Sequence, residues 1–192
     1  MAVAPYPPAS PWRDTPYRFG RLTRWLHWSM AILLGWQFLG LGLKEVLGRG
    51  HMLTDLVAPS HSHVGLLLLV LVVVRALWGL TQLGRRPSSS GLIGAAAWLG
   101  HSLLYLLMLA VPLLATLRML GNTRPFAWFG VIPLNDGQGQ RVDWMVDLAR
   151  QWHGTLGWVL LALIAGHVLM VLVHRYMLQD TVADRMIGRV RD

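Results

Sequence analysis

Three histidines follow one another along the apolar segment 151–176, at His153, His167 and His174. At about 100° per helical residue, a step of fourteen residues returns to within about 40° of the starting direction, and a step of seven to within about 20°. The three imidazoles therefore share one stripe of a helix. His153 and His167 lie about 21 Å apart along its axis, so each falls in a different leaflet of a membrane. Ionisable groups inside a span are costly and by default functional, which makes this stripe a candidate site.

Other histidines lie at matching depths in the remaining apolar segments. They are His27, His61, His63 and His101. His27 lies at the depth of His167, whereas His61 and His63 lie at the depth of His153. Two facing imidazoles at equal depth can form the axial pair of a b-type haem, which is held without covalent attachment, and two stacked pairs would carry electrons across the bilayer. A zinc site or a proton pathway would use carboxylates, but no Asp or Glu lies inside an apolar segment.

The segments that carry these histidines have the length and composition of membrane-spanning helices. Of 192 residues, 54% are hydrophobic and only 14% are charged, against about 25% charged in a typical soluble chain. A soluble protein would have almost no sequence left to cover four such helices. We predict an all-α integral membrane protein, a four-transmembrane-helix bundle with an amphipathic helix in the third loop. The apolar runs are roughly Trp25–Leu43, Val64–Leu83, Leu92–Leu117 and Gly154–Val173.

We expect residues 1–192 to form a single membrane domain. Its predicted parts are an N-terminal arm over 1–20, helices over about 22–43, 61–83, 92–117 and 151–176, a loop over 118–150 and a tail over 177–192. The proline-rich arm has no apolar core before Trp25, so the first helix is expected to act as the insertion signal in place of a cleaved signal peptide. In the third loop, Val142, Met145, Val146 and Leu148 are spaced as an amphipathic helix that leads into the fourth span.

Charge and cysteine content narrow the function classes. Ten Lys and Arg residues flank the spans on the side of both termini, against six on the other side, so both termini are predicted to face the cytoplasm and the 118–150 loop the periplasm. The net charge of +8 is then mainly a topology signal, since no soluble domain remains to bind nucleic acid. The absence of cysteine excludes disulfides, iron–sulfur clusters and covalently attached c-type haem.

Several motifs in this order and spacing resemble the bacterial cytochrome b561 family, which is related to the cytochrome b subunits of nickel hydrogenases. The resemblance covers about 17–187. It is carried by "RLTRWLHW" in the first span, "HSHVGLLLLVLVVVRALW" in the second, "HSLLYLLMLAVPL" in the third, "RPFAWFGVIPL" in the loop, and "HGTLGWVLLALIAGHVLMVLVHRY" and "DTVADRMI" at the end. It implies a protein of the bacterial inner membrane that binds two haem b groups.

The resemblance also implies which histidines bind iron. The family's second helix carries a His four residues before a Gly and fourteen before an Arg, a spacing that His61 fits and His63 does not. His61 and His153 are therefore assigned to the periplasmic-side haem, and His27 and His167 to the cytoplasmic-side haem. His63 is expected to be a hydrogen-bond partner or a residue that faces the headgroups.

Four further residues are expected at the cofactor or substrate sites. Arg75 is expected to pair with a haem propionate or to reach the cytoplasmic interface. His101 matches a family histidine that is not an axial ligand, which suggests a haem-pocket, quinone-pocket or packing role. In family members a histidine at the position of His174 lies next to a quinone site, and histidine suits the delivery of protons to a reduced quinone. Ser29 could hydrogen-bond a quinone carbonyl or its own helix.

The sequence is compatible with three functions. Stand-alone family members are similar to superoxide oxidase, which passes electrons from periplasmic superoxide to ubiquinone, and the loop arginines Arg118, Arg124, Arg141 and Arg150 could attract this anion. The alternative is a haem-bearing anchor that passes electrons between quinone and a partner dehydrogenase or hydrogenase subunit. The third, a histidine-lined metal or proton transporter, is disfavoured because the spans lack acidic residues.

Overall fold

A computed structural model describes residues 10–87 and 91–189 of the chain. In this part of the chain, four helical segments are long and apolar enough to cross a membrane, so the predicted all-α membrane bundle is confirmed. Three of the spanning segments are the helices α1 (Arg21–Leu47), α4 (Gly91–Leu120) and α5 (Asp143–Leu172), and the remaining one contains α3 (His61–Thr81).

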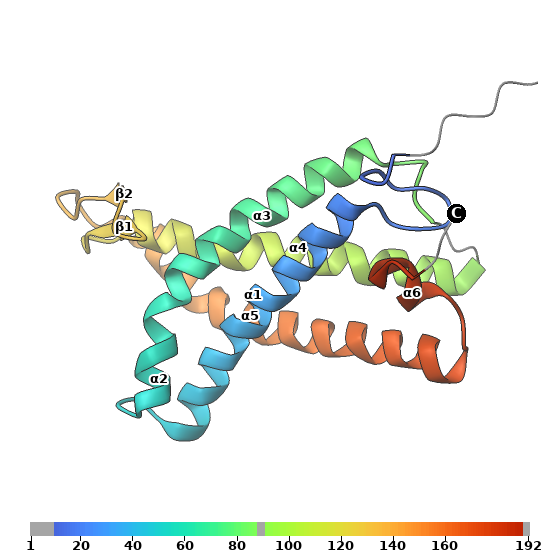
Figure 1. The fold of residues 1–192 in the computed structure, drawn as a ribbon. Helices are drawn as coiled ribbons and strands as arrows, with labels where there is room; N and C mark the ends of the chain where they lie inside the picture. The colour runs from blue at the N-terminus through green and yellow to red at the C-terminus, as the bar shows by residue number, and fades with distance from the viewer. Residues whose placement is uncertain (1–9, 88–90, 190–192) are drawn as a thin grey trace, which may run out of the picture.

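The four long helices follow one another around the bundle. α3 packs against both α1 and α4, and α4 packs along α5 (Figure 1). Met30 of α1 and Val72 of α3 are each 2% exposed in one apolar cluster, and Leu160 of α5 meets Leu104 and Leu107 of α4 in a second. Because each cluster joins neighbouring helices, helix packing fixes the depth at which every histidine lies.

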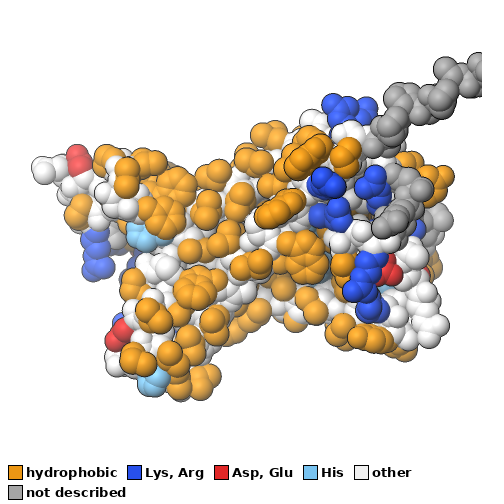
Figure 2. Space-filling view, in the orientation of Figure 1, with side chains coloured by type: hydrophobic (Ala, Val, Ile, Leu, Met, Phe, Trp, Pro, Cys, Tyr) orange, Lys and Arg blue, Asp and Glu red, His pale blue; other side chains and the backbone are white. Residues whose placement is uncertain are grey.

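The outward faces of these helices are apolar, as a lipid environment requires. Ile32 is 71% exposed, Leu92 90% and Trp98 72%. Hydrophobic side chains cover most of the visible surface along the bundle, whereas Lys and Arg gather near its ends (Figure 2). In a soluble protein such a large apolar surface would be buried, so this surface matches a chain that spans the bilayer several times.

One end of the bundle carries a short hairpin, and we call it the hairpin end. Strand β1 (Phe126–Trp128) pairs antiparallel with β2 (Ile132–Asn135), with a bulge between Phe126 and Ala127. The short helix α2 (Met52–Val57) and the 3-10 turn η1 (Ala58–Ser60) lead into α3 at this same end (Figure 1). The sequence had predicted neither the hairpin nor α2.

The opposite end holds both ends of the described chain, and we call it the terminal end (Figure 1). α5 continues into a π-helical turn, η2 (Val173–Met177), after which α6 (Val182–Ile187) folds back against the start of α1. Arg24 Nη1 donates to the carbonyl of Ile187 at 3.2 Å, and Trp28 Nε1 to that of Met186 at 3.4 Å. These two contacts hold α6 beside α1.

A buried carboxylate closes the terminal end. Asp14 is 3% exposed and accepts hydrogen bonds from the Gly20 N–H at 2.8 Å, from the Thr23 hydroxyl at 2.7 Å and from Arg86 Nε at 3.0 Å. Its own N–H donates to the side chain of Gln82, which is 2% exposed. The part of the N-terminal arm from residue 10 is therefore bound to the loop that follows α3, and residues 1–9 of the predicted arm lie outside the described residues.

The fourth long helix differs from the prediction in its start. α5 begins at Asp143, whereas the span was expected from 151. The amphipathic helix predicted in the third loop is thus present as the first turns of α5, continuous with the span. Val146 and Ala149 are its buried residues, at 4% and 1% exposed, so this part of the helix packs one side against the protein.

Candidate functional site

At the hairpin end the structure brings His61 and His153 together. Their ring centroids lie 6.1 Å apart and the ring planes meet at 82°. His61 is the first residue of α3, and Gln37 of α1 donates a hydrogen bond to its carbonyl at 3.0 Å. The pairing thus joins the start of α3 to α5 across the bundle.

The hydrogen bond of His153 defines its tautomer. Its Nδ1 lies 2.9 Å from the carbonyl oxygen of Val111 in α4. A carbonyl oxygen can only accept, so Nδ1 carries the hydrogen and Nε2 keeps its lone pair. Imidazoles that bind metal ions are commonly oriented by this kind of hydrogen bond. His153 is therefore held in the form that a metal ligand requires.

The spacing of the His61–His153 pair fits one iron between two imidazoles. With metal–nitrogen bonds of about 2 Å on each side and the ring radii added, two axial imidazoles have centroids about 6 Å apart. One helical turn after His153, a Cβ built on Gly157 would meet nothing within 4 Å, so the backbone beside the pair faces open space. The residues present therefore fit a haem group at this end.

At the terminal end the structure brings three imidazoles together. The rings of His27 and His167 lie 6.3 Å apart at 68°, and the ring of His101 lies 5.3 Å from that of His167 at 82°. Nδ1 of His101 contacts the carbonyl of Ala97 at 2.6 Å. The His27–His167 spacing again fits one iron between two rings, whereas His101 lies closer to His167 than an axial pair allows.

Arg75 lies against His27 at this end. Its Nη1 is 3.0 Å from Nδ1 of His27, and its Nε donates to the hydroxyl of Tyr105 at 2.9 Å. Arginine is always protonated and has no acceptor, so Nδ1 of His27 accepts and the hydrogen of the neutral ring is on Nε2. A nitrogen that carries hydrogen cannot bind a metal ion. His27 could therefore bind a metal ion through Nε2 only if Arg75 donated its hydrogen bond elsewhere, for example to a haem propionate.

The remaining predicted residues lie outside these clusters. His63 is a hydrogen-bond partner, the first of its two expected roles: its Nδ1 accepts the N–H of Phe129 at 3.0 Å, and its ring stacks on Phe126 and Phe129, both at 5.1 Å. Ser29 Oγ donates to carbonyls of its own helix, at 2.9 Å to Trp25. His174 lies on η2 beside Arg175, with Nδ1 2.6 Å from Asp180 Oδ2.

Sequence reasoning missed Tyr105, Asp180 and the Asp14 cluster. Each contacts a partner that local spacing does not reveal: Tyr105 meets Arg75 from another helix, and Asp14 meets Arg86 at a separation of 72 residues. Within residues 10–87 and 91–189, no group of three or more His, Cys, Asp or Glu side chains is arranged to hold a metal ion directly.

Comparison with known proteins identifies the family. The family model for prokaryotic cytochrome b561 matches residues 18–189. The chain belongs to this family. Among cytochrome b561 relatives, it is 32% identical over 187 residues to "Cytochrome b561 homolog 2" of Escherichia coli (strain K12), covering 92% of this chain and 94% of the relative. It is also 25% identical to "Cytochrome b561 homolog 1" of the same organism, over 90% and 98% of the two chains. A third relative, 25% identical over 86% of this chain and 93% of its own, is "Probable superoxide oxidase CybB" of Yersinia pestis.

Membership of the cytochrome b561 family establishes the general activity. The protein is a multi-pass membrane protein of a prokaryotic family that transfers electrons by means of haem b. The resemblance inferred from the sequence motifs is confirmed over nearly the same residues. The paired imidazoles are the part of this chain that suits such a cofactor.

Proposed function

We propose that this protein binds two haem b groups and passes electrons from superoxide at the hairpin end to ubiquinone at the terminal end. The observation that carries this proposal is the pair of ring contacts, His61–His153 at 6.1 Å and His27–His167 at 6.3 Å. His153 and His167 lie on one helix, about 21 Å apart along its axis, so the pairs lie in opposite leaflets. We propose superoxide as the electron donor because the Yersinia pestis relative is named a probable superoxide oxidase.

The overall reaction balances in electrons and protons. Two superoxide anions lose one electron each and become two dioxygen molecules, and one ubiquinone takes up the two electrons and two protons to become ubiquinol. Each bound haem b would carry one electron at a time between its ferric and ferrous states. The excess of positive charge at the terminal end supports a topology with that end in the cytoplasm of a bacterial cell and the hairpin end in the periplasm.

The hairpin end suits a small anionic donor. His61, the first residue of α3, is exposed at this end. Arg118 and Arg124 are exposed and contribute positive charge, whereas Arg141 is paired with Asp143 at 2.7 Å and Asp147 at 3.4 Å. Basic residues around an opening raise the local concentration of an anion.

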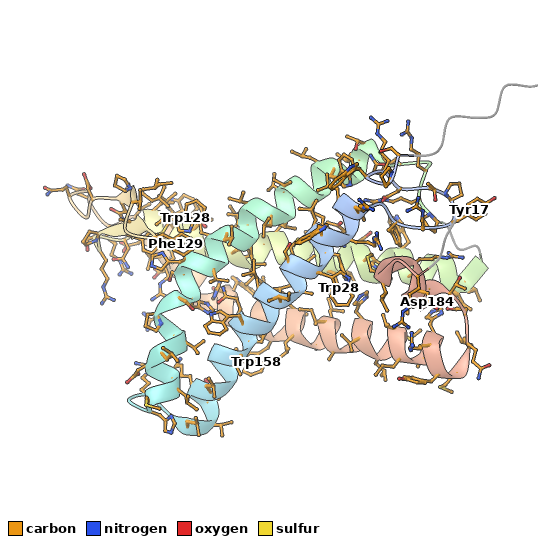
Figure 3. The ribbon with its side chains drawn as sticks, viewed as in Figure 1. Tyr17, Trp28, Trp128, Phe129, Trp158 and Asp184 are labelled. Atoms are coloured by element: carbon orange, nitrogen blue, oxygen red, sulfur yellow. The ribbon has the colours of Figure 1, made fainter. Side chains whose placement is uncertain are left out.

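The terminal end has a hollow that suits a quinone ring. Its volume is about 390 Å³, and it is lined by Arg21, Arg24, Trp25, Trp28, Met186 and Ile187. Trp28 of α1 lies at the end of the bundle that carries Asp184 of α6 (Figure 3). Indole rings can stack on a quinone and guanidinium groups can donate to its carbonyls. Ser29 keeps an acceptor lone pair but directs its hydrogen to its own helix, and its quinone contact remains a prediction.

His174 is the proposed proton donor to the reduced quinone. We expect His174→Ala to retain two haems with unchanged spectra and to be reduced by superoxide at the original rate, because that reaction takes place at the other end. Reoxidation by added ubiquinone should slow by about 100-fold or more, since a general acid is lost. Normal reoxidation would remove the quinone role of His174 while leaving the haem assignment intact.

Stopped-flow spectroscopy of the purified protein tests the function itself. Superoxide should reduce the haems faster than it disproportionates, and pyridine haemochrome analysis should give two haem b per chain. Haems that ubiquinol reduces but superoxide does not would instead favour the alternative function, a haem-bearing anchor that exchanges electrons with a partner dehydrogenase. One haem or none would contradict the two-pair assignment.

A further inference from the structure

Asp180 is held between His174 and the start of α6. Its Oδ2 lies 2.6 Å from Nδ1 of His174, and its Oδ1 accepts the N–H of Val182 at 3.0 Å. The N–H of Asp180 in turn donates to the carbonyl of His174 at 3.2 Å. Both carboxylate oxygens are thereby fixed, and the pair joins the end of α5 to α6.

The local backbone explains why these two residues meet. η2 is a π-helical turn, in which the N–H of Leu178 donates to the carbonyl of Val173 at 3.0 Å. Gln179 then adopts φ 52°, a left-handed conformation that is uncommon for residues other than glycine. This reversal brings Asp180 back to the ring of His174. π-helical turns and unusual backbone angles are frequent at functional sites.

The contact defines which nitrogen of His174 can exchange a proton. Partial burial raises the pKa of Asp180, but the hydrogen bonds from the Val182 N–H and from His174 outweigh it and hold this pKa below its ordinary value. Asp180 is therefore ionised at neutral pH and can only accept. The shared hydrogen belongs to Nδ1 of His174, and Nε2 is left as the exchanging nitrogen.

We propose that Asp180 is a positioning residue that holds His174 with Nε2 free to deliver a proton to the reduced quinone at the terminal end. This inference rests on the proposed function. The Nε2–H bond of the imidazolium breaks and an O–H bond forms on the quinone oxygen, while the electrons arrive one at a time along the haem pathway proposed above. The neutral ring keeps its Nδ1–H bond to Asp180. Nε2 then regains its proton from water, which can reach the ring because the His174 side chain is 15% exposed.

The surrounding charges supply a matched control. Arg175 pairs with Asp184 at 3.5 Å, and Arg185 acts on Asp180 through its charge. Arg24 of α1 reaches this segment at Ile187. Asp184 is a nearby carboxylate on the six-residue helix α6, which begins two residues after Asp180. Its ion pair is with Arg175 and not with His174. Asp184→Asn therefore removes a neighbouring charge and leaves the contact between Asp180 and His174 in place.

The test compares Asp180→Asn, Asp180→Glu, Asp184→Asn and His174→Ala in the full-length haem-loaded protein. Haem reoxidation by a short-chain ubiquinone is followed by stopped flow between about pH 5.5 and pH 8.5, a range that brackets the ordinary pKa of histidine. Haem spectra and reduction by superoxide are recorded in parallel. We expect Asp180→Asn to slow reoxidation by about 10- to 100-fold near neutral pH, as loss of a group that orients a functional histidine commonly does.

The pH profile separates positioning from simple structural support. Asp180→Asn removes the negative charge that contacts Nδ1 at 2.6 Å, so the rate profile of this variant should move to lower pH, and Asp180→Glu should recover part of the rate. Asp184→Asn should match the wild type. If His174→Ala is slow and Asp180→Asn is normal, the inference is wrong and the proposed function stands. Equal slowing by Asp180→Asn and Asp184→Asn with an unmoved profile would also overturn it, as would normal reoxidation in His174→Ala.

Discussion

The hairpin end brings two imidazoles together, whereas the terminal end gathers three imidazoles and a guanidinium. At the hairpin end, the carbonyl of Val111 already sets His153 in the ligand form. At the terminal end, Arg75 donates to Nδ1 of His27 and sets the opposite tautomer. The proposed iron ligand His153 thus already has the tautomer that ligation through Nε2 requires, whereas His27 would acquire it only if Arg75 changed its hydrogen-bond partner. The same residue type, at the same ring spacing, has a different chemical state at the two ends.

The largest expected effect is the loss of a whole haem from one end. His61→Ala removes one ring of the hairpin-end pair and should reduce the haem content from two to one per chain, measured by pyridine haemochrome analysis. His63→Ala is the matched control, because His63 binds the hairpin through Phe129 and is not in the His61–His153 contact. The reverse result would show that the iron ligand of this helix is His63.

The same kind of experiment tests whether His27 or His101 is the iron ligand that faces His167 at the terminal end. We expect His101→Ala to keep both haems, because His27 and His167 remain 6.3 Å apart, and His27→Ala to lose the terminal-end haem. Haem content and low-spin electron paramagnetic resonance signals distinguish the two variants. If His101→Ala loses a haem and His27→Ala does not, the ligand of this end is His101.

A smaller effect is expected from the charge of Arg75. A nearby positive charge favours the reduced haem, so Arg75→Gln should lower the midpoint potential of the terminal-end haem on the order of tens of millivolts and leave the other unchanged. Optical redox titration measures both potentials in one sample. Tyr105→Phe removes only the hydroxyl that Arg75 contacts and should give a smaller shift. Equal shifts of both haems in Arg75→Gln would contradict the one-ended placement.

The smallest effect concerns the approach of the anion at the hairpin end. Arg141→Gln removes one positive charge and leaves Asp143 and Asp147 without this partner, so it should slow haem reduction by superoxide by less than about a factor of two. Arg118→Gln, which removes an exposed charge at the end of α4, should slow it by a similar factor. Both differences should disappear at high ionic strength, where surface charges are screened. A persistent difference would indicate a structural cause.

Periodicity predicted the parts of this protein that repeat along a helix. The four spans follow from apolar runs, and equal depth predicts the ring contact of His27 with His167. Depth allowed either His61 or His63 to meet His153, and the resemblance to the family selected His61, which makes the contact. Iron ligation by these residues remains a prediction. Depth works as a guide because a helix in a bilayer has a fixed rise per residue. Depth does not show which neighbouring group sets the tautomer of each ring.

The features that the sequence did not predict depend on short irregular segments and on local backbone geometry. The hairpin has one strand of three and one of four residues, too short for a periodic signal, and its contact with α3 runs through His63. Asp180 lies in the quoted motif "DTVADRMI", but its contact with His174 depends on a π-helical turn and a left-handed residue. Neither backbone feature has a clear mark in the amino-acid pattern.

The ion pair between Asp14 and Arg86 bears on how the chain is assembled in a membrane. Asp14 precedes the first span and Arg86 follows the second, so the pair can form only after both helices have been inserted and the chain has returned to its starting side. A carboxylate that has lost its partner is costly to bury, which favours late closure of this contact over early closure. The pair thus forms late in biosynthesis, and a nascent chain that stops before Arg86 would bury Asp14 without its positively charged partner.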